Sequence, residues 1–238
     1  MAKRPPIGKC IHCLKDRVER NWDHVFPVGW YPDTTPDNID KWKAPSCVAC
    51  NSALGRVESR FISLIALTLD PMARETAGIP EKVLRSLKSE FARNVVDALA
   101  RTAAAKRVTG SIYRGPFEAE NIYPTAGSEA ARNGSDPIPF LIPVELFEKV
   151  TEKIVRGIMY VETGRFIEPP LRVQFFPDGP NMPSSEFAQV IRTHGKTLER
   201  QPGIQINHAI APEDGFSGFF EIVFWGGQMK TYASVGAD

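Results

Sequence analysis

Apolar residues spaced three or four positions apart predict three main helices along the chain. The first covers residues 51–69, where one side carries Leu54, Val57, Phe61, Ile62, Ile65 and Leu69. A long second helix is predicted over 81–107, from the apolar positions Val83, Leu87, Phe91, Val95 and Leu99. A third covers 144–160 and follows Pro143, a residue that suits the first turn of a helix.

Short apolar runs bounded by turn residues predict strands. One run lies within residues 22–26 and ends at Pro27. In the last third of the chain, strands are predicted at 171–176, 204–210, 219–224 and 229–235. The glycine-bearing turn 225–228 joins the last two strands into a hairpin, and a short helix over 185–193 separates the first two.

Together these elements predict an α+β protein in three parts. Residues 1–69 form an N-terminal module, and residues 70–137 form a helical connector and linker. The stretch 109–138 is rich in Gly, Pro, Ser, Asn and Asp, which is typical of a loop, with one short strand near 111–113. Residues 138–238 form an α+β domain with an antiparallel sheet.

The composition is that of a globular protein. Of 238 residues, 42% are hydrophobic and 10% aromatic, which argues against a disordered chain. We expect no membrane helix, since no run of about 18 apolar residues exists, and without an export signal we expect a cytoplasmic location. Residues 1–110 carry 18 Lys and Arg against 12 Asp and Glu, whereas residues 111–238 carry 11 against 16. A polyanion would therefore bind the N-terminal half of the chain. The alternative is that the clustered basic residues only form a solvated surface.

Four cysteines form two C-x-x-C pairs, Cys10 with Cys13 and Cys47 with Cys50. Two such turns supply the four thiolates that a tetrahedral zinc site needs. A redox C-x-x-C is usually a single pair, and disulfides are disfavoured in a reducing compartment. We therefore predict a structural zinc ion that holds a small module together, with four buried thiols as the alternative.

The candidate catalytic residues are Asp23, His24 and Asn51. Asp23 and His24 lie in the predicted strand, and Asn51 follows Cys50 directly. Zinc would tie the start of the helix to the first cysteine pair and so bring Asn51 near the other two. The oxygens of Asp23 and Asn51 are hard ligands suited to Mg²⁺, and a neutral His24 can take a proton from water. This set predicts attack of water on a phosphodiester.

The segments CIHC, DHVFP and CVACN, together with Asn38, resemble the HNH, or His-Me finger, nuclease superfamily. The resemblance covers about residues 8–62 and is greatest to the phage endonuclease VII branch, with its Asp-His pair and Asn variant. It implies a ββα-metal, treble-clef-like zinc module that cleaves DNA. Asp23 and Asn51 would hold catalytic Mg²⁺ or Mn²⁺, His24 would be the base, and Asn38 would position that base.

The alternative is a zinc module that binds nucleic acid or a protein partner without catalysis. Several other residues are weaker candidates for functional contacts. His12 is expected to be exposed on the knuckle, the turn formed by the first C-x-x-C pair, rather than to replace a cysteine as ligand. Glu58 is expected to pair with Arg56 or Arg60 rather than to support the metal weakly. Trp42 could stack on a base or cap a small core. Four basic residues around the first cysteine pair could contact phosphates or could form a solvated face: Lys9, Lys15, Arg17 and Arg20.

The C-terminal domain shows no catalytic pattern in its sequence. Its histidines His194 and His208 are single, without Cys or paired carboxylate neighbours, and we interpret them as core or surface residues. We expect the domain to recognise substrate, to mediate a homo-oligomer or to hold a protein partner.

Overall fold

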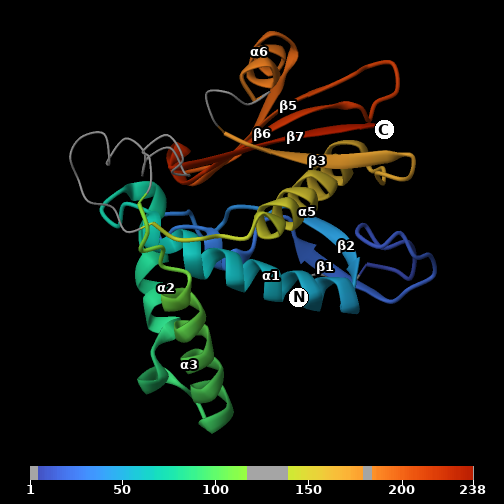
Figure 1. Cartoon of the computed structure of the whole chain (residues 1–238). Coiled ribbons are helices and arrows are strands. Elements are labelled where there is room, and N and C mark those ends of the chain that lie inside the picture. Colours follow the sequence, from blue (N-terminus) through green and yellow to red (C-terminus); the bar gives the residue numbers. More distant parts are fainter. Residues whose placement is uncertain (1–4, 117–138, 179–183, 238) are drawn as a thin grey trace.

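The computed structural model describes residues 5–116, 139–178 and 184–237 (Figure 1). It combines helices with two antiparallel sheets, so the predicted α+β class is confirmed. Most of the predicted linker, residues 117–138, lies outside the described residues. The short strand expected near 111–113 is a single bridge between Ile112 and Phe140.

The front of the chain builds two paired strands and a helix. Strand β1 (Arg20–His24) pairs antiparallel with β2 (Lys43–Cys47), and α1 (Val48–Ile65) follows β2 directly. The helix begins before the predicted start because the side chain of Cys47 accepts a hydrogen bond from the backbone N–H of Cys50, as an N-cap does. One cysteine pair is thereby built into the first turn of α1.

The predicted long helix over 81–107 is wrong, because two helices occupy this stretch. After the short 3-10 turns η2 (Ala66–Thr68) and η3 (Arg74–Thr76), the chain forms α2 (Ile79–Leu87), η4 (Ser89–Phe91) and α3 (Val95–Gly110). Asn94 is extended, and its side chain accepts a hydrogen bond from the N–H of Asp97 at 2.9 Å, which starts a new helix.

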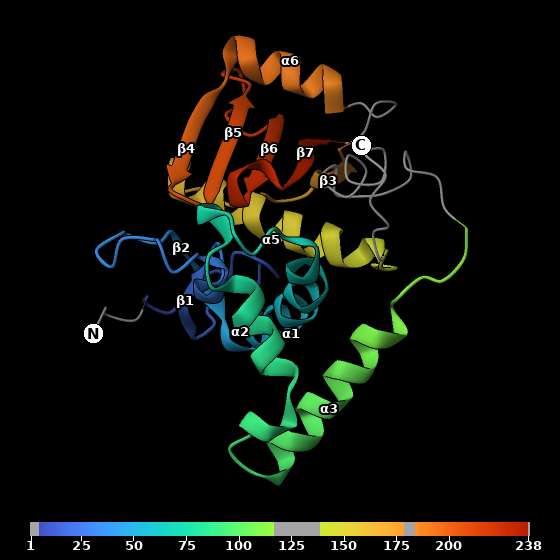
Figure 2. The same cartoon turned by 90° about the vertical axis from the view of Figure 1, so that its left-hand side faces the viewer.

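The apolar stripe assumed for that long helix is also not buried. Val95, Val96 and Leu99 are exposed on α3. Figure 2 shows α3 at the end of the molecule away from the five-stranded sheet. The four-residue spacing of these apolar residues was therefore a poor guide to burial.

The C-terminal part is an antiparallel sheet between helices. Helix α5 (Val144–Thr163) covers one face and α6 (Ser184–His194) the other (Figure 1). In the order β3-β7-β6-β5-β4, the strands are β3 (Leu171–Pro177), β7 (Met229–Ala237), β6 (Gly218–Phe224), β5 (Ile204–Ile210) and β4 (Lys196–Arg200). The turn η6 (Trp225–Gly227) joins β6 to β7, so the predicted hairpin is confirmed. Strand β4 was not predicted, because its sequence KTLER is mostly polar and lies at an edge of the sheet.

Helix α5 lies between the sheet and the front of the chain. Phe147 on α5 meets Phe61 on α1 with ring centroids 5.1 Å apart, and Phe61 also stacks on Trp30. A Cβ at Gly157 would lie 2.7 Å from the side chain of Val25, so α5 passes very close to the end of β1. The buried side chains consequently form one cluster that joins both ends of the chain.

Candidate functional site

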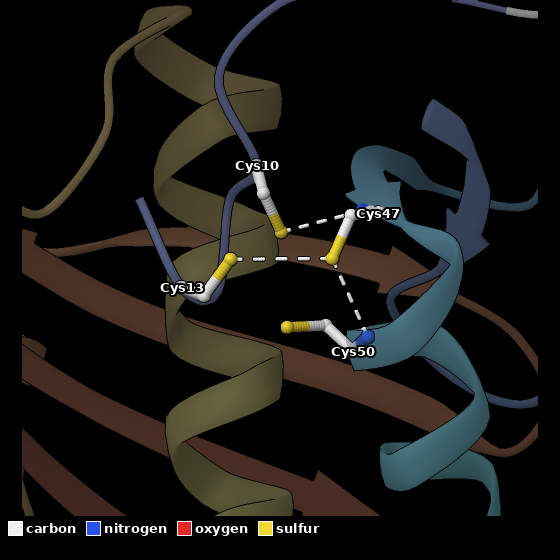
Figure 3. A group of neighbouring side chains, drawn as sticks. All are labelled: Cys10, Cys13, Cys47 and Cys50. Atoms are coloured by element: carbon white, nitrogen blue, oxygen red, sulfur yellow. Dashed lines mark hydrogen bonds between the residues drawn. The ribbon is translucent and has the colours of Figure 1, made fainter. Parts of the chain in front are cut away.

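The four cysteines lie together at the start of α1. Figure 3 shows their side chains pointing toward one another, and their sulfur atoms all lie within 4.8 Å of one another. The Sγ atoms of Cys13 and Cys47 are 3.9 Å apart. A tetrahedral zinc ion with Zn–S bonds of about 2.3 Å needs sulfurs at about this separation. All four thiols are free, so the donor set fits zinc.

Backbone amides around the sulfurs favour thiolates. The N–H of Cys47 donates to Cys10 Sγ at 3.3 Å, and the N–H of Cys50 donates to Cys47 Sγ at 3.4 Å. Burial opposes ionisation of Cys10, but the backbone N–H groups outweigh it and lower its pKa to about 6. Burial and the neighbouring thiols raise the pKa of Cys50. Four crowded sulfurs can thus all ionise only when a cation balances them.

Asp23 lies in a buried ionic environment. Only 6% of the residue is exposed. Its Oδ2 lies 3.0 Å from Nε2 of His12, and its Oδ1 lies 3.2 Å from Nζ of Lys153. His12 was expected to be exposed on the knuckle, and this is wrong because Asp23 draws its ring inward.

Lys153 comes from α5 and is 3% exposed. Its ammonium also ion-pairs with Glu58 of α1 and donates to the backbone carbonyl of His24. Burial raises the pKa of Glu58, and Lys153 opposes that rise. We call His12, Asp23, Glu58 and Lys153 the buried ion cluster. The expected pairing of Glu58 with its helix neighbours is replaced by this contact from a distant part of the chain.

Asn51 lies beside β1, as predicted, but it contacts a different residue. Its Nδ2 donates to Oδ1 of Asn21 at 3.0 Å. Asn21 precedes Asp23 by two positions, so both project from the same face of the strand. Asn51 was predicted to lie near Asp23 and His24, and the structure gives it Asn21, two positions before Asp23, as its hydrogen-bond partner.

His24 is half-buried and projects from the opposite face of β1 to Asp23, since successive side chains of a strand alternate. Burial lowers the pKa of His24, and the nearby Lys43 lowers it further. The imidazole is therefore neutral at pH 7. Asn38 is exposed in the loop before β2.

Asp23 and Asn51 carry the oxygen donors that Mg²⁺ prefers. In this arrangement, however, the Asp23 carboxylate is already neutralised by Lys153 and held by His12. The side-chain nitrogen of Asn51 donates to Asn21, which fixes the orientation of its amide. As they stand, these residues do not fit a divalent ion.

A cavity of about 280 Å³ borders the buried ion cluster. Its lining includes His12 and Lys153, the basic residues Lys149 and Arg156, and the apolar residues Ala53, Leu54 and Val57. The cavity lies where α1, α5 and the first cysteine pair meet, and His12 and Lys153 are the members of the cluster that line it.

Some residues considered for nucleic-acid contact have partners within the chain. Lys9 forms a 2.7 Å ion pair with Glu168, and Arg20 donates to the backbone carbonyls of Pro6 and Lys9. Trp42 is buried, with the guanidinium of Arg200 4.4 Å from its ring centroid. Capping of the core is therefore the role that the structure gives Trp42.

Lys153 is the residue that the sequence interpretation missed. A signal for it existed, since Lys153 falls between Val150 and Ile154 on the apolar face of its helix. A lysine in such a position is rarely buried without a partner, so a carboxylate facing it could have been expected.

No protein-family model matches the chain, and no curated protein or solved structure matches it. No helix among the described residues combines the length and apolar character needed to cross a membrane.

Proposed function

We propose that β1, β2, α1 and the cysteine cluster form an HNH-type nuclease module that hydrolyses phosphodiester bonds in DNA. One observation carries the proposal. The cysteines tie the first turn of α1 to the N-terminal knuckle, and α1 thereby sets Asn51 against the strand that bears Asp23 and His24. A purely structural zinc site has no need of the half-buried His24 at the end of β1.

In this proposal the chain's own residues have separate duties. Neutral His24 takes a proton from the attacking water. The buried ion cluster supports the strand from its other face, and Lys153 holds the carbonyl of His24 itself. Zinc, when bound to the cysteines, supplies structural stability and no reaction step.

The test is nicking of supercoiled plasmid DNA in MgCl₂ or MnCl₂ by purified protein. His24→Ala is expected to lower the rate by roughly 100-fold or more, because it removes the base. Asn51→Ala should lower it too. The control His194→Ala alters an exposed histidine at the end of α6 and should cut at the wild-type rate. Nicking that survives both the His24 and the Asn51 substitution contradicts the proposal.

A second candidate is a zinc module that binds nucleic acid or a protein partner without cutting. The observation in its favour is that Asp23 is buried and neutralised by Lys153. For this candidate, wild-type protein shifts DNA in a gel but leaves plasmid intact in both metals, and His24→Ala shifts DNA equally. Pairing with a second copy or another protein through the C-terminal domain remains a prediction.

A further inference from the structure

The ammonium of Lys153 already fills a place suited to a cation. Three oxygen-bearing groups surround it: the carboxylates of Asp23 and Glu58 and the backbone carbonyl of His24. Carboxylate and carbonyl oxygens are also the ligands that hard divalent ions take in proteins. The strand and α1 thus place three oxygen atoms around one point, and α5 supplies the positive charge there.

This charge is held firmly. Lys153 is 3% exposed, and its neighbours Val150 and Ile154 are buried in the shared core. A divalent ion beside Asp23 would lie next to the ammonium in a poorly solvated space, where like charges repel strongly. The ion and the ammonium therefore exclude one another.

We propose that Lys153 competes with a divalent cation for Asp23 and Glu58, so that a side chain of helix α5 occupies the place that a metal ion would take. The use of that metal in cleavage rests on the proposed function, whereas the competition itself does not. Such competition explains why the carboxylates of Asp23 and Glu58, which could hold a metal ion, are paired with a lysine. It gives the C-terminal part of the chain a direct influence on the front module.

The test compares Lys153→Met with wild type in the full-length, zinc-loaded chain. Methionine keeps the length and apolar stem of the side chain but removes the charge. Mn²⁺ affinity is measured by electron paramagnetic resonance of free Mn²⁺, with melting temperature as a second readout. We expect Lys153→Met to bind Mn²⁺ at least tenfold more tightly than wild type. Lys153→Arg keeps the charge and should stay at the wild-type affinity.

Two further variants locate the effect. Lys149→Met removes an exposed lysine from the same cavity, one turn earlier on α5, and should leave Mn²⁺ affinity at the wild-type value. Adding Glu58→Gln to Lys153→Met should cancel the gain. If Lys149→Met tightens binding as much as Lys153→Met, the effect is general electrostatics and the inference is wrong.

Loss of a buried charge can prevent folding, so the same variant is also tested by refolding. If Lys153→Met is unfolded in zinc-containing buffer, recovery of its native circular dichroism with MnCl₂, but not with NaCl of equal ionic strength, supports the inference. Failure to recover, or unchanged Mn²⁺ affinity in a folded variant, overturns it. Tighter Mn²⁺ binding without nicking by any variant would preserve the competition and refute the nuclease proposal.

Discussion

Asp23 and His24 are neighbours in β1 but meet different surroundings. Asp23 faces α1 and α5 and is ion-paired, whereas His24 projects from the other face and is half-buried. Their adjacency in the sequence indicated a shared role in one pocket. The alternation of the strand separates their side chains, and the backbone contact from Lys153 to His24 connects the two faces.

Another histidine gives a pH prediction at the residue scale. His208 in β5 is 3% exposed, stacks on Phe220 and lies 3.9 Å from Glu162. Burial lowers its pKa below the usual value of about 6.5, an effect that Lys196 adds to and Glu162 opposes. At His208, the unfolded chain therefore binds more protons than the folded chain as the pH falls below about 6.5.

The free energy of unfolding should consequently fall as the pH drops below about 6.5. Above that pH, the titration of His208 should no longer change it. Urea unfolding at pH 7.5 and 5.5 measures this. His208→Gln should show a smaller loss between the two pH values than wild type, while His194→Gln, in an exposed position, should match wild type. An equal loss in His208→Gln and wild type would mean that other groups cause the pH dependence.

At the scale of elements, α5 decides the environment of the candidate site. It packs on the five-stranded sheet with one side and on α1 with another (Figure 1). Its approach to β1 is permitted by Gly157, where a Cβ would be 2.7 Å from Val25. Lys153 reaches Asp23 and Glu58 only because the helix passes this close.

Two glycine-to-alanine changes test this packing with the same chemistry. Gly157→Ala should destabilise the protein by about 1–3 kcal/mol, because the added methyl overpacks against Val25. Gly55→Ala, in the middle of α1, meets no heavy atom within 4 Å and should stabilise by roughly 0.5–1 kcal/mol. Urea unfolding of both variants measures the difference, and effects of equal sign would contradict the close approach of α5.

At the scale of the whole molecule, the front module and the C-terminal sheet share one core. Trp30 after β1 meets Phe224 at the end of β6 and Trp225 in the turn η6, and the indole N–H of Trp225 donates to the carbonyl of Trp30 at 2.9 Å. The buried side chains of residues 1–69 and 138–238 are therefore continuous among the described residues.

Zinc removal should then affect the whole chain. We expect one zinc per molecule by atomic emission, and a chelator should lower the melting temperature in a single transition. Far-ultraviolet circular dichroism and tryptophan fluorescence should report the same midpoint. Cys13→Ser should resemble the chelated protein. A melt in which only one probe changes, or no change on chelation, would contradict a shared, zinc-dependent core.

The sequence alone determined those features that depend on local pattern. Two C-x-x-C pairs, the hydrophobic periodicity of α5 and the alternating strands around a tight turn predicted the cysteine cluster, that helix and the hairpin. These three features depend on short-range geometry, and the spacing of residues along the chain indicates that geometry directly. The break before α3 was missed although Asn94 is a good cap, because the apolar spacing continued through it.

Only the tertiary structure decided which charges meet. Lys153 is 130 positions away from Asp23, and no spacing rule connects them. Their contact follows from the packing of α5 across β1 and α1, where burial forces each charge to find a partner. The kinds of side chain at the candidate site were therefore readable in the sequence, while their pairing depended on the global arrangement of helices.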